Sequence, residues 1–249
     1  MRKTLMTVIA LLVFVLSLSA CSADTVHQST DLKLEKRAKS PSVIINKNQK
    51  KWSKNTSHIP VIRSDAQHFD DRGHVAQSMY QLKNVNKAVI KGTIYNLEQM
   101  NSPEDLAFTK ATVHIDQVIS GDESLKNKTV YLTLNGGITS SDHKGSNHEM
   151  FVKYDEFPLP KIGSQIIVGL LPTQLDEPTE YNQAVKQSGF NNKNFYIVNM
   201  PQFNFWVKGE NDDKYHLNNP KVKKSLISDL DMRAAIVQLT KEINQKYNK

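Results

Sequence analysis

Alternating apolar and polar residues between residues 88 and 207 predict a series of short β-strands. The alternation is clearest over residues 129–135, where every second side chain is apolar and a pair of glycines follows. Residues 165–171 instead form one apolar run, as expected of a strand that is buried on both faces. We predict further strands at residues 88–95, 108–119, 194–198, 203–207 and 214–217.

Apolar residues at helical spacing predict a short helix at residues 74–83 and a C-terminal amphipathic helix at residues 221–247. Val118 and Ile119 fall out of the alternation of their strand, which indicates a β-bulge or a twist there. Residues 138–161 and 175–194 show little periodicity, and we expect them to be loops. The pattern predicts an α+β, mainly β, fold in which a small antiparallel barrel occupies a single domain, residues 61–249.

Residues 21–60 are polar and basic, and they contain few large apolar groups. Such a stretch buries too little surface to offset its ordering entropy, so we expect a flexible, solvated tether in which residues 43–45 and Trp52 are able to dock locally. Residues 22–54 carry eight Lys or Arg against three acidic residues, whereas residues 55–249 carry 22 of each sign. The charge balance of the domain argues against a nucleic-acid binder. The positive charge of the tether predicts that it binds anionic headgroups or wall polymers. Each basic residue near such a surface contributes about 1 kcal/mol to the attraction.

The first 21 residues have the anatomy of a secretory signal peptide. Arg2 and Lys3 precede an apolar run that is shorter than the roughly 20 residues of a membrane-spanning helix. Small residues then lead to Cys21, the only cysteine in the chain, so the fold has no disulfide. One interpretation is an ordinary cleaved signal that leaves a free thiol near the new terminus.

The sequence Leu18-Ser19-Ala20-Cys21 resembles the lipobox of bacterial lipoproteins. The resemblance implies that Cys21 receives a diacylglyceryl group with palmitate-type chains, and that residues 1–20 are removed. It implies an extracytoplasmic protein held at the cell membrane by lipid, and the Lys- and Asn-rich composition is compatible with a Gram-positive surface. Two acyl chains suffice for stable anchoring.

The strand region resembles the OB-like barrels of secreted bacterial proteins, which are distantly similar to netrin-like and metalloprotease-inhibitor modules. The resemblance rests on core and turn positions, and it implies a fold rather than an activity. The chain has Ser120-Gly121 where the pattern has Lys-Gly, and it lacks the cysteines of the netrin-like members. The matching segments are residues 89–94, 113–121, 129–132 and 161–170.

Signatures of catalysis are absent from the sequence, including nucleophile elbows, zinc-protease motifs and phosphate-binding or dinucleotide-binding glycine loops. The lipobox also removes Cys21 as a nucleophile. His143, His148 and Glu149 lie close together and are candidate metal ligands, although their spacing matches no zinc motif and a polar surface loop is the simpler interpretation. His68, Asp70, Asp71 and His74 form a second polar cluster with candidate metal ligands, and capping of the helix that follows by Asp70 or Asp71 is the simpler interpretation.

Trp206 and His114 are two further aromatic positions that could take part in binding. Trp206 faces the opposite side of its strand from Phe203 and Phe205, either as a ligand-binding platform or, as we favour, packed under the C-terminal helix. His114 alternates out of the core face of its strand, which predicts a solvated or barrel-mouth histidine.

We therefore expect a non-catalytic binding or accessory module without a cofactor, anchored in the membrane, with an extracellular protein as a further partner. The alternatives are a metal-assisted hydrolase that uses residues 142–149, and a protease-inhibitor-like module.

Overall fold

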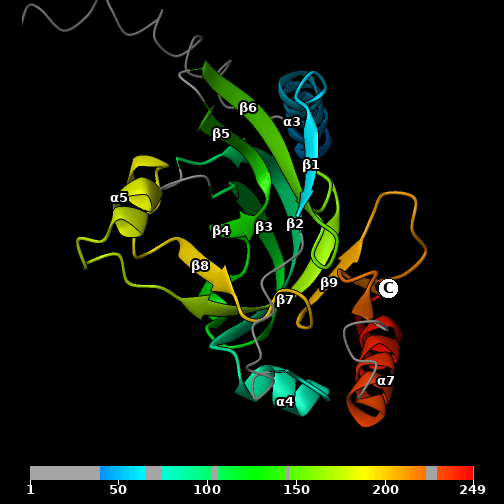
Figure 1. Ribbon diagram of the computed structural model, residues 1–249. Helices are drawn as coiled ribbons and strands as arrows, with labels where there is room; N and C mark the ends of the chain where they lie inside the picture. Colours follow the sequence, from blue (N-terminus) through cyan, green and yellow to red (C-terminus); the bar gives the residue numbers. More distant parts are fainter. Residues whose placement is uncertain (1–39, 65–74, 102–105, 144–145, 223–228, 249) are drawn as a thin grey trace, which may run out of the picture. The chain divides into compact units, whose positions relative to one another are not determined.

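The computed structural model describes residues 40–64, 75–101, 106–143, 146–222 and 229–248 (Figure 1). Residues 41–249 form one compact unit. The predicted signal peptide, the lipobox and the polar cluster at residues 68–74 lie outside the described residues. Within the described part of the chain, no helix is both long enough and apolar enough to cross a membrane.

Five strands form a closed barrel, which confirms the predicted α+β, mainly β, OB-like fold (Figure 1). A meander of three antiparallel strands comes first, and β7 then pairs antiparallel with both β2 and β8. The barrel closes through a parallel pair between β4 and β8, so it is not antiparallel throughout. The strands are β2 (Ala88–Gln99), β3 (Phe108–Ser120), β4 (Thr129–Asn135), β7 (Gln165–Pro172) and β8 (Phe195–Val198).

The inward residues of these strands fill the barrel with aliphatic side chains, among them the alternating apolar residues of β4. The long strands β2 and β3 bend through three shifts in their register. One shift leaves Ile119 without a partner, which confirms the predicted bulge. Gly92 stands at another shift, where a Cβ atom would lie 2.6 Å from the backbone oxygen of His114. Glycine at this position allows the two backbones to approach closely.

A second, three-stranded sheet contradicts the predicted loop at residues 138–161. It has the order β1-β6-β5 and consists of β1 (Val61–Ser64), β5 (Gly137–His143) and β6 (Ser146–Tyr154). Gly136 and Gly137 do end β4 as predicted, but with φ values of 95° and 112° they turn the chain directly into β5. The sheet buries little apolar surface, with Ile138 and Phe151 in a small cluster, so the sequence lacks a clear alternation.

A helix, α3 (Pro41–Thr56), contradicts the prediction that the flexible tether extends to residue 60. Ile45 and Trp52 pack against the barrel core. Asn48 Nδ2 donates to the backbone oxygen of Tyr95 at 2.8 Å, and Gln49 Nε2 donates to that of Ile162 at 2.8 Å. These contacts supply the tertiary packing that a polar helix of this length needs in water.

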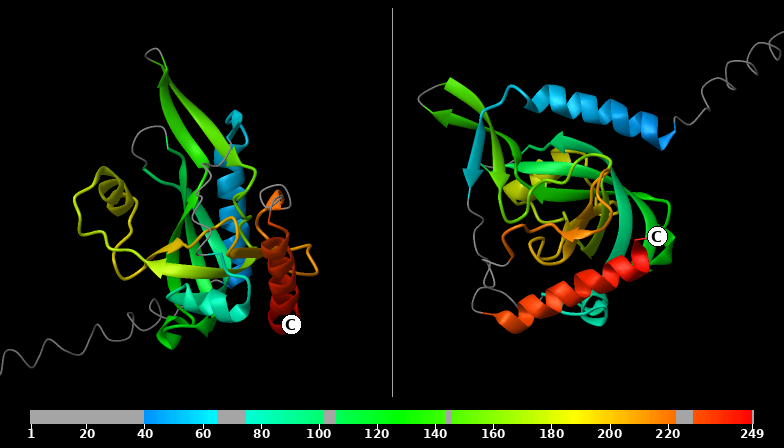
Figure 2. Two further views of the ribbon diagram at one scale, coloured as in Figure 1. Left: turned by 60° about the horizontal axis from the view of Figure 1, so that its bottom comes forward. Right: turned by 90° about the vertical axis from the view of Figure 1, so that its right-hand side faces the viewer.

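The remaining elements surround the barrel, with α3 and α7 on opposite sides of it (Figure 2). A helix within the predicted loop at residues 175–194 contradicts that prediction, and the C-terminal helix is confirmed over its second part. These elements are α4 (Met79–Asn84), the 3₁₀ turn η2 (Glu123–Leu125), α5 (Glu180–Gln187), β9 (Phe205–Lys208), β10 (His216–Leu217) and α7 (Leu230–Tyr247). The helix predicted at residues 74–83 begins only at Met79, and Ser78 caps it, so the predicted capping by Asp70 or Asp71 is wrong.

Candidate binding site

A cavity of about 310 Å³ opens where the parallel pair that closes the barrel comes apart. The last register partners of this pair are Thr133 on β4 and Ile197 on β8. Beyond these partners β4 and β8 diverge, and residues that follow the last pair in each segment line the cavity. Because the end of β4 leads into the second sheet and β8 leads into the loop at residues 199–202, the separation follows from the topology.

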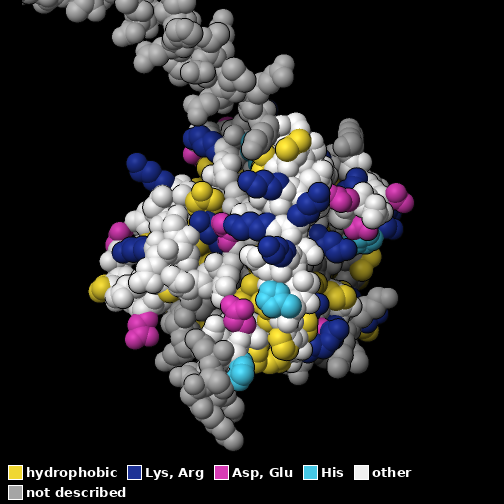
Figure 3. Space-filling model, turned by 90° about the horizontal axis from the view of Figure 1, so that it is seen from above, with side chains coloured by type: hydrophobic (Ala, Val, Ile, Leu, Met, Phe, Trp, Pro, Cys, Tyr) yellow, Lys and Arg dark blue, Asp and Glu magenta, His cyan; other side chains and the backbone are white. Residues whose placement is uncertain are grey.

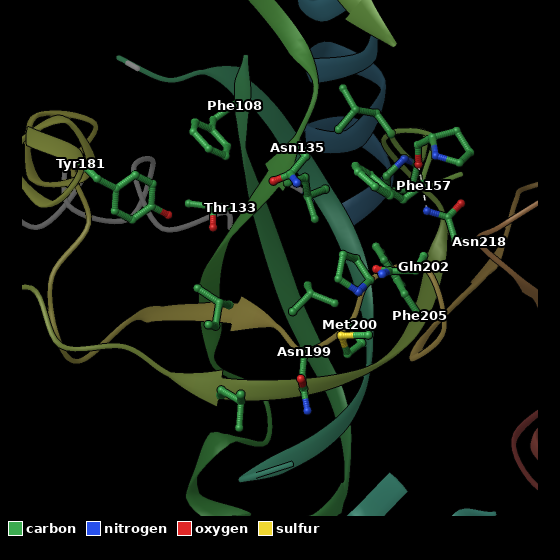
Figure 4. A pocket seen from close by; sticks show the side chains of 18 residues that line it. Phe108, Thr133, Asn135, Phe157, Tyr181, Asn199, Met200, Gln202, Phe205 and Asn218 are labelled. Carbon is green, nitrogen blue, oxygen red and sulfur yellow. Dashed lines mark hydrogen bonds between the residues drawn. The ribbon is translucent and has the colours of Figure 1, made fainter. Parts of the chain in front are cut away.

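Residues of several other elements complete the walls of this cavity, which we call the barrel-end pocket (Figure 4). Tyr181 of α5 and Phe108 of β3 stand at one end, and the segment 157–160 stands at the other. The wall residues are mostly aromatic, aliphatic or proline. The full lining consists of Phe108, Thr133, Leu134, Asn135, Phe157, Pro158, Leu159, Pro160, Leu171, Tyr181, Ile197, Val198, Asn199, Met200, Pro201, Gln202, Phe205 and Asn218.

Hydrogen bonds hold the walls of the pocket in place. Asn218 Nδ2 donates to the backbone oxygen of Pro158 at 2.8 Å, which fixes the segment 157–160 (Figure 4). Asn199 Nδ2 donates to the backbone oxygen of Val85 at 3.1 Å, which fixes the loop after β8. Side-chain hydrogen bonds therefore hold the backbone of two wall segments of the pocket in place.

The pocket is uncharged. None of the described residues that line it is Asp, Glu, Lys, Arg, His or Cys. Its one titratable group is Tyr181, which forms a side-chain hydrogen bond with Thr133, and burial raises the pKa of its phenol, so this group is neutral at physiological pH. The pocket offers apolar contact together with amide and hydroxyl groups, which suits binding of a neutral, amphipathic molecule.

A second cavity, of about 550 Å³, lies between α3 and β6. Gln49, Trp52, Ser53 and Thr56 form its α3 wall. It shares Asn135 and residues 158–160 with the barrel-end pocket, so the segment 158–160 separates the two cavities.

Trp206 does not line either cavity. Its side chain is fully buried, and its Nε1 donates to Thr240 Oγ1 of α7 at 2.9 Å. Trp206 is therefore a core residue under the C-terminal helix, as favoured from the alternation, and it is not a ligand-binding platform.

The candidate metal ligands lie at the end of the β5–β6 hairpin, not in a loop. His148 and Glu149 are successive residues of β6, so their side chains leave opposite faces of the strand. The side chain of His143 lies outside the described part of the structure, and the described residues contain no group of three metal-binding side chains.

His114 is half-buried, and its ring stacks on Tyr95 with the centroids 5.3 Å apart. Cys21 lies outside the described residues, so its lipidation stays a prediction.

Sequence reasoning missed the residues of the barrel-end pocket. They come from segments that are far apart in the chain, and only the topology brings them together. The available signal was the density of proline and aromatic residues at 157–160 and 200–203.

No protein-family model matches this chain, and a search of curated proteins finds no match to it.

Proposed function

We propose that this protein is a lipid-anchored module on the extracytoplasmic face of the cell membrane, and that it binds a neutral, amphipathic small molecule without transforming it. The observation that carries the binding part of the proposal is the uncharged barrel-end pocket. Its volume lies at the lower end of the roughly 300–1,000 Å³ typical of ligand sites. The anchor part rests on the lipobox ending in Cys21.

The chemistry of the lining supports binding rather than catalysis. Acid–base and nucleophilic mechanisms need a group whose protonation state changes near the working pH. The pocket instead presents the amides of Asn135 and Gln202 beside aromatic rings, a combination that orients a ligand by hydrogen bonds and desolvates its apolar part. A charged ligand would have to lose its hydration there without gaining an ionic partner.

The ligand class can be tested with Nile red, a neutral dye whose emission rises in apolar surroundings. We expect the wild type to bind it saturably. The variant Asn135→Asp/Gln202→Glu adds two charges at nearly unchanged shape, and we expect it to bind the dye at least ~10-fold more weakly, because the dye would then have to desolvate two carboxylates.

The matched control is Asn46→Asp/Gln183→Glu, which places the same charges at exposed positions outside the pocket. This variant should bind the dye like the wild type. If the wild type shows no saturable binding, or if both variants bind equally, the barrel-end pocket is not the binding site.

The anchor can be tested by feeding producing cells with labelled palmitate. We expect label on the wild-type protein and none on Cys21→Ser, because Cys21 is the only cysteine that could carry the lipid. Equal labelling of both proteins, or of neither, would show that Cys21 is not lipidated.

A further inference from the structure

The outward face of α3 carries a stripe of four lysines. Lys47, Lys50, Lys51 and Lys54 follow one another at i, i+3, i+4 and i+7, which places them on one side of the helix. All four side chains are exposed. We call this set the α3 lysine stripe.

The opposite face of α3 is fixed to the barrel, so the stripe is held in one orientation. Ile45 and Trp52 pack against the core, and the ring of Trp52 meets Phe151 edge-on at a centroid distance of 6.2 Å. Asn48 and Gln49 add the two hydrogen bonds to backbone oxygens of the barrel region. Because the helix is already folded and docked, binding requires no ordering of its backbone, and more of the interaction energy is retained.

Within the described part of the chain, no acidic side chain pairs with the stripe, and the carboxylate that reaches α3, that of Glu210, accepts from Gln49 on the docked face at 3.0 Å. Residues 40–64 contain no Asp or Glu, and no described residue forms an ion pair with any of the four lysines. Lysine and arginine side chains predominate over acidic ones across the side of the molecule seen in Figure 3. Like charges at i, i+3 and i+4 destabilise a helix, so the stripe has a cost to the fold that binding of an anionic partner would offset.

We propose that the α3 lysine stripe binds the anionic phospholipid headgroups of the membrane in which Cys21 is anchored. This inference rests on the proposed lipid anchor. Only residues 22–40 separate the lipidated Cys21 from α3, and these 19 residues span at most about 65 Å even when fully extended. The covalent link therefore keeps the stripe at high effective concentration near one charged surface.

The expected strength of this contact follows from the number of lysines. Each basic residue near an anionic membrane strengthens partitioning by about fivefold, so four lysines together supply on the order of several hundredfold. The attraction fades within a Debye length of about 8–10 Å at physiological salt, so the contact must be close. Binding would turn the α3 side of the barrel towards the bilayer and would leave the α7 side facing away (Figure 2).

The test uses the mature chain with Cys21→Ser, so that no lipid contributes to binding. Co-sedimentation is measured with vesicles of phosphatidylcholine, with or without about one third phosphatidylglycerol. We expect binding to the anionic vesicles only, and we expect it to weaken as salt is raised. Removal of the stripe by Lys47→Gln/Lys50→Gln/Lys51→Gln/Lys54→Gln should weaken binding at least ~100-fold.

The matched control, Lys126→Gln/Lys128→Gln/Lys186→Gln/Lys193→Gln, removes the same charge from four exposed lysines outside α3 and should bind nearly as well as the wild type. Equal loss in the two variants would show that only the net charge matters. Equal binding to both kinds of vesicle would also contradict the proposal. Binding to soluble polyphosphate but not to vesicles would assign the stripe to a wall-type polyanion instead of the membrane.

These results can be separated from a failure of the proposed function. Palmitate labelling reads the anchor, dye binding reads the pocket, and neither involves the stripe. Circular dichroism and the urea midpoint of the stripe variant should match those of the wild type or exceed them slightly, because removing like charges relieves repulsion along the helix.

Discussion

At the scale of single residues, the turn between β4 and β5 depends on Gly137. Its φ of 112° lies where L-amino acids with a side chain are strained. A Cβ atom there would also clash with Thr109 Oγ1. That hydroxyl is buried and donates to the backbone oxygen of Gly136 at 2.7 Å, so it cannot move away without losing its partner.

We expect Gly137→Ala to lower the free energy of unfolding by about 2–5 kcal/mol, from backbone strain together with the displaced hydroxyl. Urea denaturation measures this loss. Gly209→Ala is the milder control, because φ at Gly209 is not positive. A new Cβ there would lie 2.9 Å from Oδ2 of Asp212, an exposed side chain that can move at the cost of its hydrogen bond from Gly209 N. A loss at Gly137 no larger than at Gly209 would contradict the strain argument.

Tyr215 makes the stability of the protein sensitive to alkaline pH. Its side chain is fully buried, its hydroxyl donates to Gln165 Oε1 at 3.1 Å, and burial raises its pKa well above the ordinary value of 10.0, with the charge of Asp116 adding to the effect. The folded chain therefore keeps this proton at a pH where the unfolded chain releases it. The contribution of Tyr215 is complete below pH 10 and falls above it, by about 1.4 kcal/mol per pH unit.

We expect Tyr215→Phe to be less stable than the wild type at pH 7, because the hydrogen bond to Gln165 is lost, by about 1 kcal/mol. The difference should shrink or reverse between about pH 10 and 11, since phenylalanine releases no proton on unfolding. Urea midpoints of both proteins across this range measure the effect. Parallel pH profiles would show that Tyr215 titrates normally in the folded state.

Residue-level prediction from the sequence succeeded where a periodic pattern was strong. Alternation placed Trp206 opposite Phe205, and the structure puts Trp206 beneath α7 and Phe205 in the barrel core. The barrel-end pocket could not be predicted in this way. Its walls come from several elements, and their meeting depends on the point where β4 and β8 separate.

At the scale of elements, α3 shows why composition misled the sequence prediction. The helix has no fully buried residue, and its docking face offers only Ile45 and Trp52 as large apolar groups. Amide side chains that bond to the barrel backbone supply the remaining contact. Such polar docking cannot be recognised from hydropathy. The β5–β6 hairpin and α5 were missed for the same reason, because each buries few apolar side chains.

We expect Trp52→Ala to undock α3 in a fraction of the molecules, because the edge-on contact with Phe151 and the packing on the barrel core are lost. Truncation of a large aromatic typically costs about 3–5 kcal/mol, and partial exposure of this residue reduces that figure to about 2 kcal/mol. Tryptic cleavage at the lysines of α3 should then accelerate by about tenfold or more, because cleavage follows local opening.

The control for this prediction is Val43→Ala, which truncates an apolar residue of α3 that is 52% exposed. Its tryptic cleavage should match that of the wild type. If Trp52→Ala is cleaved no faster than Val43→Ala, the stability of α3 does not depend on its contact with the barrel.

At the scale of the whole molecule, the position of α3 moves the boundary of the compact unit to Pro41. The structure also changes the assignment of the positive charge, from a flexible tether to a folded helix. Residues 22–40 carry four basic and three acidic residues, whereas α3 carries four lysines and no acidic residue. Most of the net charge predicted for a tether therefore belongs to one face of a folded helix.

We expect the free energy of unfolding of a chain that starts at Pro41 to equal that of a chain that starts at Ser22, within about 0.5 kcal/mol. A chain that starts at Ser57 lacks α3 and should lose at least about 2 kcal/mol, because the barrel surface under Trp52 becomes exposed. Calorimetry or urea unfolding distinguishes these outcomes. Equal stability of all three chains would place α3 outside the cooperative unit.

The parallel pair of β4 and β8 also determines when the molecule can fold. It joins Tyr131 to Phe195 across 64 positions of sequence, and without it the barrel stays open. During synthesis or export the N-terminal strands come first, so the barrel cannot close until β8 is also available. Long-range pairing of this kind is slow. For a protein that we propose to be exported, late closure of the barrel would keep the chain unfolded, and so competent for translocation, until most of it has crossed the membrane.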